Sequence, residues 1–122
     1  MINERPHKKL EAWKKSIALV TLIYEETKTF PRDEEFGLKS QLRRAAVSVP
    51  SNIAEGLTRK SRNDKLHFLN IAQASLSEID TQIEISLRLS IIDNARYRRI
   101  ETQMIEVQKL LAGLSRKLKN VD

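Results

Sequence analysis

The chain lacks cysteine and has little glycine or proline. Its 122 residues include three glycines, three prolines and no cysteine. The absence of cysteine excludes a disulfide framework, a thiolate metal site and a cysteine nucleophile. So few turn-forming residues disfavour a fold with many strands, whereas abundant Leu, Ile, Ala, Glu, Lys, Arg and Gln favour long helices. We expect a single domain over residues 1–122, long enough to bury a core.

Long apolar runs are also absent from the sequence. No stretch approaches the roughly 20 apolar residues that are needed to span a bilayer. The N-terminal segment MINERPHKKLEAW is charged and has no apolar run like that of a signal peptide. We therefore expect no membrane contact and, because cysteine is absent as well, a cytoplasmic location.

Apolar residues recur at steps of three and four along most of the chain, which predicts an all-α fold. The predicted helices cover residues 10–29, 33–55, 63–89 and 94–119. The residues expected to cap the last three helices at their N-termini are Asp33, Asn63, and Asp93 or Asn94. Connections of roughly four to eight residues favour an antiparallel up-down-up-down four-helix bundle.

The first predicted helix carries two apolar flanks. The flank with the spacing of a bundle seam consists of Leu10, Trp13, Ile17, Val20, Tyr24 and Thr27. The second flank consists of Ala12, Leu19, Ile23 and Phe30. Two flanks indicate that this helix contacts more than one neighbour, in the same bundle or in another subunit.

The second predicted helix contains a proline. An apolar stripe within residues 38–49 defines its buried face. Pro50 then removes a backbone N–H and pushes its ring towards the carbonyl of Ala46. We expect helix 2 to be kinked at Pro50, or a new segment to begin there with Ser48 as its cap. Gly56 is expected to end the helix in the left-handed conformation.

Residues able to support catalysis or metal binding are sparse. Ser48 and Ser51 flank Pro50, but no histidine lies nearby in the sequence to activate either hydroxyl. Asp64 and His67 have the acid-x-x-His spacing of helical di-iron sites, but a second such pair on another helix is missing. We therefore expect no enzyme activity, no cofactor, no metal site and no small-molecule substrate.

Basic residues outnumber acidic ones, with a formal net charge of +6 and a pI of about 9.8. Such a balance fits nucleic acid or an acidic partner. The densest basic segment, which suits phosphate contacts but is also typical of a solvated turn, consists of Arg59, Lys60, Arg62 and Lys65. Lys117 and Lys119 are expected to complement the negative end of the dipole of the last helix.

A second basic cluster opens the fourth predicted helix and consists of Arg96, Arg98 and Arg99. Positive charge opposes the dipole at that end, which favours an external or inter-subunit acidic partner. Arg96 and Arg99 are our second choice for nucleic-acid contacts. Core spacing assigns the aromatic side chains of Trp13, Tyr24, Phe30 and Tyr97 to packing rather than to base stacking.

A polar group in the second predicted helix consists of Arg43, Arg44, Asn52 and Glu55. Arg43 and Arg44 point about 100° apart on a helix, so at least one should lie near the edge of the apolar stripe. There it needs a carboxylate or a backbone carbonyl. One interpretation is an internal or inter-subunit ion pair, with Glu55 or Glu78 as the acid. The other is a phosphate contact.

The stretch QLRRAAVSVPSNIAEG, residues 41–56, closely resembles the central motif of the 23S rRNA intervening-sequence proteins, also called S23 ribosomal proteins. The flanking matches are Trp13, Tyr24, Thr27, Phe30-Pro31, Gly37-Leu38, Arg59, Phe68-Leu69, Ser75-Leu76 and Glu78. The resemblance covers roughly residues 8–118. It departs at Gln73-Ala74-Ser75, where the family has an Arg-Gly-Ser-like triplet, so a role of that triplet in close packing or ligand contact is in doubt.

The resemblance implies an antiparallel four-helix bundle that assembles into a homopentameric ring. It implies no enzyme activity, because none is established for the family. Some members are encoded within intervening sequences of 23S rRNA genes, and related pentamers bind nucleic acid. The resulting hypothesis is a non-enzymatic, homo-oligomeric bacterial protein that binds structured RNA, such as rRNA, through its basic loops. The alternative is a homo-oligomeric protein-interaction scaffold that binds no nucleic acid.

Overall fold

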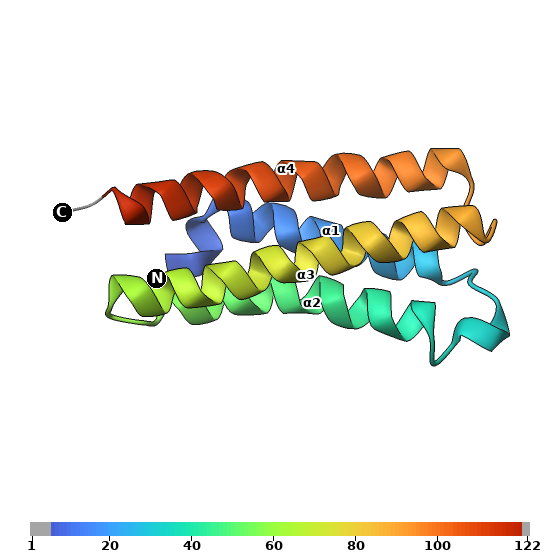
Figure 1. The fold of residues 1–122 in the computed structure, drawn as a ribbon, viewed down its shortest axis with the longest axis horizontal. Coiled ribbons are helices and arrows are strands. Elements are labelled where there is room, and N and C mark those ends of the chain that lie inside the picture. The colour runs from blue at the N-terminus through green and yellow to red at the C-terminus, as the bar shows by residue number, and fades with distance from the viewer. Residues whose placement is uncertain (1–5, 121–122) are drawn as a thin grey trace, which may run out of the picture.

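The computed structural model describes residues 6–120, and these residues are almost entirely helical (Figure 1). The α-helices are α1 (Glu11–Thr27), α2 (Leu38–Leu57), α3 (Arg62–Arg88) and α4 (Asn94–Lys119). Two short 3-10 helices, η1 (Pro6–Lys9) and η2 (Arg32–Glu34), precede α1 and α2. The prediction of an all-α four-helix bundle is confirmed.

The helices run side by side, and the chain reverses direction at each connection (Figure 1). Each helix contacts two others, in the cyclic order α1, α2, α3, α4 and back to α1, and the α2–α3 contact is the most extensive. The α1–α2 and α3–α4 connections lie at one end of the bundle. The α2–α3 connection and the C-terminal end of α4 lie at the other (Figure 1).

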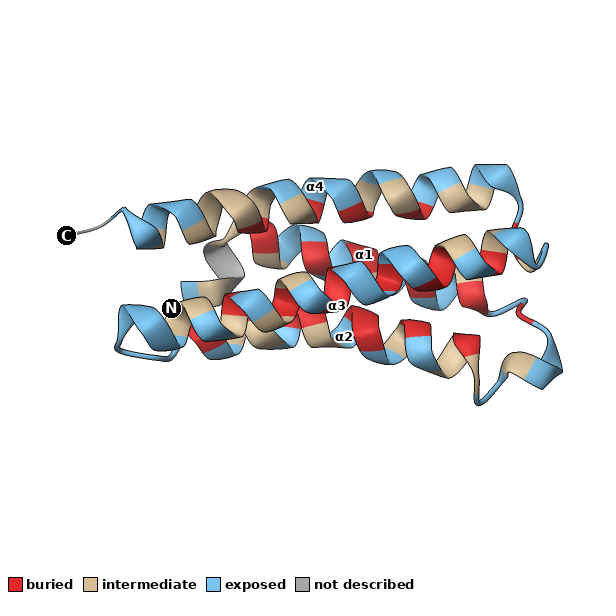
Figure 2. Ribbon diagram, viewed as in Figure 1, coloured by how far each residue is buried: buried red, intermediate tan, exposed pale blue. Residues whose placement is uncertain are grey.

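The core is formed by the inward faces of all four helices, which Figure 2 shows as buried stripes. Its largest fully buried side chains are Leu19, Ile23, Leu42, Val49, Ile53, Leu69, Leu76, Ile79, Ile83, Ile100, Met104 and Leu111. The buried stripe of α2 includes the predicted one within residues 38–49, and those of α3 and α4 follow the same spacing of three and four. Burial of these aliphatic groups, each contributing roughly 1.5–3 kcal/mol, is the main stabilising term of the bundle.

The buried face of α1 differs from the prediction. Its buried residues are Ala12, Ser16, Leu19, Ile23 and Thr27. The predicted seam is partly exposed, and Ile17 and Tyr24 are the most exposed of its large apolar side chains. Both flanks have helical spacing, so periodicity alone could not say which one faces the core.

The second helix begins later than predicted, at Leu38, and is preceded by the short helix η2. Asp33 does not cap it. The Leu38 N–H donates instead to Glu34 Oε1 at 3.0 Å. The third helix is capped by Ser61, whose Oγ accepts from the Asp64 N–H at 3.0 Å, rather than by Asn63. Asp93 caps α4 as expected.

Pro50 lies inside α2, which runs as one helix from Leu38 to Leu57. Ser48 is therefore not the cap of a new segment, and the bend stays a prediction. The Ser51 hydroxyl donates to the Val47 carbonyl at 2.8 Å, and the Asn52 amide donates to the Ser48 carbonyl at 2.8 Å. Pro50 has no backbone N–H to donate, and these two side chains supply hydrogen-bond donors in the same turn of the helix.

Gly56 does not adopt the left-handed conformation that we expected, since no glycine in the described chain has a positive φ. It is buried within α2, and a Cβ there would lie 3.3 Å from the Lys65 carbonyl oxygen and 3.3 Å from Phe68 Cβ. The glycine therefore serves the close approach of α2 and α3 next to their connection.

Candidate functional site

The basic segment, residues 59–65, covers part of the α2–α3 connection and the first turn of α3. It lies at one end of the bundle, together with the last turn of α4 (Figure 1). Arg59, Lys60 and Arg62 are exposed, and Lys65 is half-buried. The last turn of α4 adds the exposed side chains of Arg116, Lys117 and Lys119. We call these seven residues the basic end. The sequence pattern did not predict that the two groups share one end, because about 50 residues separate them along the chain.

Two contacts hold Arg59 in place. Its guanidinium pairs with Glu55 at 2.5 Å and lies 4.7 Å from the centre of the Phe68 ring. Glu55 is therefore bound to Arg59 and not to Arg43 or Arg44. Arg59 therefore shares its positive charge with Glu55. Lys60 makes no hydrogen bond or ion pair with any residue of the 6–120 range.

Arg96 and Arg99 lie at the opposite end and share an internal acidic partner, Glu26 of α1. Arg96 Nε lies 3.0 Å from Glu26 Oε1, and Arg99 Nε lies 2.9 Å from Glu26 Oε2. Arg96 also donates to the Glu26 carbonyl and to Thr29 Oγ1. The Glu26 side chain is only 13% exposed. The expectation of an external acidic partner is therefore wrong for these two arginines, because α1 packs against α4 and supplies the acid.

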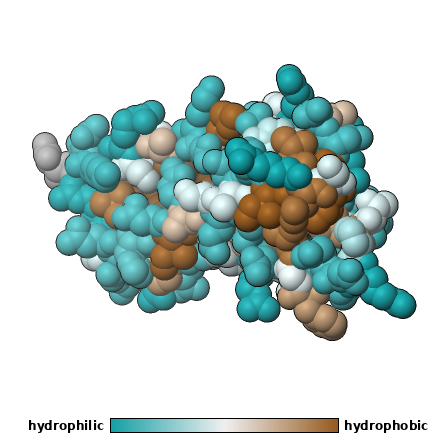
Figure 3. Space-filling view, turned by 45° about the vertical axis from the view of Figure 1, so that its right-hand side comes forward, coloured by the Kyte–Doolittle hydropathy of each residue, from teal (hydrophilic) through white to brown (hydrophobic). Residues whose placement is uncertain are grey.

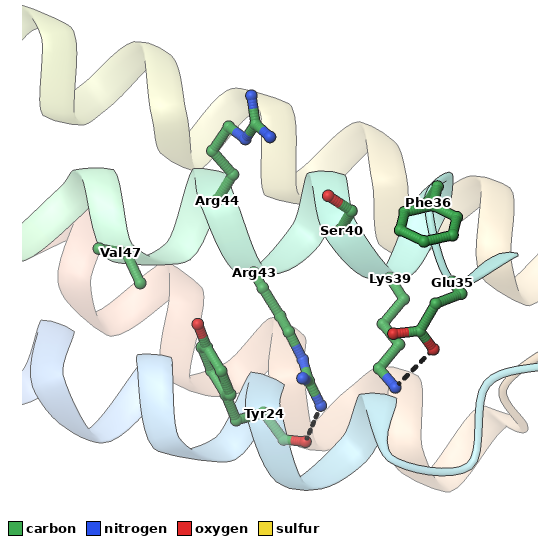
Figure 4. Close-up of a pocket in the computed structure, with 8 residues that line it drawn as sticks. All are labelled: Tyr24, Glu35, Phe36, Lys39, Ser40, Arg43, Arg44 and Val47. Atoms are coloured by element: carbon green, nitrogen blue, oxygen red, sulfur yellow. Dashed lines mark hydrogen bonds and ion pairs between the residues drawn. The ribbon is translucent and has the colours of Figure 1, made fainter.

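Arg43 joins α2 to α1 through a backbone carbonyl and a ring, not through a carboxylate (Figure 4). Its guanidinium donates to the Tyr24 carbonyl at 3.1 Å and to Thr27 Oγ1 at 2.9 Å, and it lies 4.4 Å from the centre of the Tyr24 ring. Arg44 points away from Tyr24 (Figure 4) and is exposed. Asn52 donates to Ser48 and joins neither arginine.

A surface pocket of about 480 Å³ surrounds Arg43. Most of its charges are satisfied within the chain, since Lys39 pairs with Glu35 at 3.0 Å. Phe36, on its rim, is 94% exposed. Sequence reasoning missed Phe36 because it lies outside every helical repeat, although an aromatic residue beside Gly37 in a connection was a usable signal.

The space-filling view shows a mainly hydrophilic face with a hydrophobic patch towards the end where α3 stops (Figure 3). Ile85 and Leu89, close to that end of α3, are among the large apolar side chains left exposed. Patches of this kind are typical of protein contact surfaces.

Tyr97 lies between two carboxylates near the start of α4. Its hydroxyl oxygen lies 3.2 Å from Glu84 Oε1 and 3.2 Å from Glu101 Oε2, and its single proton is donated to one carboxylate at a time. Burial, followed by the charge of Glu101, raises the pKa of Tyr97 to about 12. The hydrogen bond from Arg88 lowers the pKa of Glu84. The cluster is a structural link between α3 and α4.

The described helices include none that is long and apolar enough to cross a membrane. Among residues 6–120, no three or more His, Cys, Asp or Glu side chains gather in a way that could hold a metal ion.

A family model described as 23S rRNA-intervening sequence protein matches residues 8–113. The chain belongs to this family. The family motif lies on α2, and its Ser48 accepts a hydrogen bond at 2.8 Å from Ser75 of the divergent α3 triplet.

A solved structure from the S23 ribosomal protein family of Bacteroides thetaiotaomicron, a protein of unknown function, has a similar fold. It shares 27% sequence identity with this chain, and the TM-score is 0.77. The match covers 85% of this chain and 97% of that one. A comparison with curated proteins found no match.

Proposed function

We propose that this member of the family is a non-enzymatic, homo-oligomeric protein that binds nucleic acid, most favourably a structured RNA such as rRNA. The observation that carries the proposal is the basic end, where exposed cations of two separate elements gather at one end of the bundle. Phosphate contacts by Lys and Arg supply most of the affinity in sequence-independent binding. Arg96 and Arg99 are left out, because Glu26 binds both.

Assembly would increase the effect of weak contacts. A ring of identical subunits repeats the basic end once per subunit, and several weak contacts to one polyanion combine into useful affinity. The homopentamer implied by the family resemblance is the form that we propose, and light scattering on the purified protein tests it. A mass other than five subunits would contradict the pentamer and leave the RNA proposal to its own test.

The test of RNA binding is fluorescence anisotropy with a structured rRNA fragment, at low and at physiological salt. Binding should weaken at least about tenfold between the two conditions, as expected for several phosphate contacts. The variant R59A/K60A/R62A/K65A should bind at least about tenfold more weakly at low salt and keep its helicity. Extending it with K117A and K119A should weaken binding further.

A matched control removes the same number of positive charges from the opposite end. The variant K28A/R32A/R88A/R98A changes only exposed residues of the connections and the adjacent helix ends. It should lose much less affinity than the variant of the basic end. Equal losses would show that only net charge matters, and unchanged binding by the basic-end variant would refute the site.

A protein-interaction scaffold is the second candidate, and the exposed Phe36 favours it. An aromatic ring that is 94% exposed beside a pocket offers an anchor for a protein partner. A pulldown from nuclease-treated lysate separates the two proposals. A retained protein that is lost with Phe36→Ala, and no retained nucleic acid, would favour the scaffold.

A further inference from the structure

A polar groove of about 320 Å³ lies on the bundle surface between α2 and α3. Its lining residues are Gln41, Arg44, Ala45, Ser48, Glu78 and Gln82. A second hollow, of about 340 Å³, adjoins it and shares Gln41, Glu78 and Gln82. We call the two together the α2–α3 groove. It is distinct from the basic end and contributes nothing to the proposed RNA contacts.

One side chain of the α2–α3 groove has an unmet hydrogen-bonding capacity. Gln82 is only 8% exposed, and its Oε1 has no hydrogen-bond partner. Its Nε2 donates to Gln41 Oε1 at 3.4 Å, which is long for such a bond. Exchanging the oxygen and nitrogen of the amide would still leave one polar atom without a partner. A buried amide in this state is costly, which points to a hydrogen-bonding ligand.

Two opposite charges face the same groove without neutralising each other. Arg44 of α2 and Glu78 of α3 both line it and are exposed. Neither forms an ion pair with the other or with any residue between 6 and 120. The ion pair between Arg44 and Glu78 considered from the sequence is therefore absent, although the two residues do line one site. A guanidinium, a carboxylate and a buried amide thus surround one small volume.

We propose that the α2–α3 groove binds the head group of a free α-amino acid. The ligand carboxylate accepts hydrogen bonds from the Arg44 guanidinium, a geometry that can be bidentate. The ligand ammonium has three N–H donors, which serve Glu78 and, once the Gln82 side chain turns its amide towards the groove, the unpartnered Gln82 Oε1. The ligand side chain extends into the adjoining hollow, where Thr81 and Ile85 offer polar and apolar contacts.

Ligands of a single charge fit the groove less well. A phosphate or simple carboxylate would meet repulsion from Glu78 and leave Gln82 Oε1 without a donor. An amine without a carboxylate would leave Arg44 unused. Compared with these ligands, a zwitterion satisfies all three groups, so the site favours both charges of the head group.

The test is an NMR titration of the ¹⁵N-labelled protein with each of the common L-amino acids at millimolar concentration. At least one should shift the side-chain amide signals of Gln82 and Gln41 and reach saturation. Its N-acetyl and methyl ester derivatives, each lacking one charge, should bind at least about tenfold more weakly. No shift of these signals with any amino acid would overturn the proposal.

Substitutions then assign the contacts. Arg44→Gln and Glu78→Gln change exposed residues and should each weaken binding at least about tenfold. Gln82→Leu should abolish it while circular dichroism shows an intact bundle. Arg98→Gln, on an exposed part of α4, is the control and should leave binding unchanged. Unaltered affinity in the Arg44 and Glu78 variants would refute the site.

Light scattering on the same samples tests whether a second copy of the chain, rather than an amino acid, occupies the groove. If no amino acid binds and Arg44→Gln or Glu78→Gln changes the oligomer mass, the groove is an interface between copies and the amino-acid proposal is wrong. The titration uses no RNA and the anisotropy experiment uses no amino acid. Failure of one proposal therefore leaves the other unaffected.

Discussion

The two ends of the bundle carry charge in different ways. At the end with the α1–α2 and α3–α4 connections, several cations lie in ion pairs, such as Arg96 and Arg99 with Glu26 and Arg88 with Glu84. At the basic end, exposed lysines and arginines of two elements gather, and the ion pair that we identify there joins Arg59 to Glu55.

The comparison shows that net charge is a poor guide to where a polyanion can bind. Both ends contain arginines, but those beside Glu26 hold α1 against α4. The cations of the basic end lie in the α2–α3 connection, in the first turn of α3 and in the last turn of α4, and most of them are exposed to solvent. The net charge of +6 is therefore a sum that hides the difference between the two ends. The predictions that follow test this contrast through stability.

The largest effect is expected at Glu26. Replacing it with alanine leaves Arg96 and Arg99 without their shared carboxylate, and Arg96 is largely covered by neighbouring atoms. We expect Glu26→Ala to lower the free energy of unfolding by about 2 kcal/mol, as for the loss of one partner in a partly buried pair. Urea denaturation followed by circular dichroism measures it.

The variant of the four basic loop residues is the comparison for Glu26→Ala. Its free energy of unfolding should change by less than about 1 kcal/mol, because exposed ion pairs contribute little. If this variant lost as much stability as Glu26→Ala, the contrast in how the two ends carry charge would be wrong.

A smaller effect is expected at Tyr97, which lies at the same end of the bundle as Glu26. Phenylalanine there loses the hydrogen bond that the hydroxyl donates to one of the two carboxylates, which should cost about 1 kcal/mol at neutral pH. The folded pKa of about 12 lies above the unfolded value of about 10. The stability that Tyr97 contributes is therefore fully present below about pH 10 and is lost as the pH rises through 12.

Urea denaturation of wild type and Tyr97→Phe at several alkaline pH values tests whether this contribution to stability decreases with increasing pH. The advantage of the wild type should shrink as the pH increases from about 10 to about 12. A difference that stayed constant over this range would mean that the tyrosine hydroxyl is not held in its neutral form by the fold.

The smallest effect is expected at Ser90, in the α3–α4 connection. Its φ of 60° is the positive value that glycine adopts without strain. Ser90→Gly should raise the free energy of unfolding by about 0.5 kcal/mol, the relief of strain being partly offset by a more flexible unfolded chain. Thermal denaturation can detect it, and a lower melting temperature would contradict it.

The sequence by itself determined the helices and most of the core. Apolar spacing of three and four predicted the inward stripes of α2, α3 and α4, because a helix places such residues on one face whatever surrounds it. The family motif on α2 was also recognisable, because sixteen consecutive residues leave little room for coincidence. The N-terminal caps of α2 and α3 were predicted at the wrong residues, because several adjacent polar residues can act as a helix cap.

Only the tertiary structure decided which side of α1 is buried and which charges are neutralised. Both flanks of α1 are apolar, so the choice between them depends on how α2 and α4 pack against it. Glu26 meets Arg96 about 70 positions later in the chain, and Arg44 shares a groove with Glu78. Periodicity fixes directions within one helix, whereas contacts between helices depend on how their faces pack. The basic end and the α2–α3 groove are therefore properties of the packed bundle.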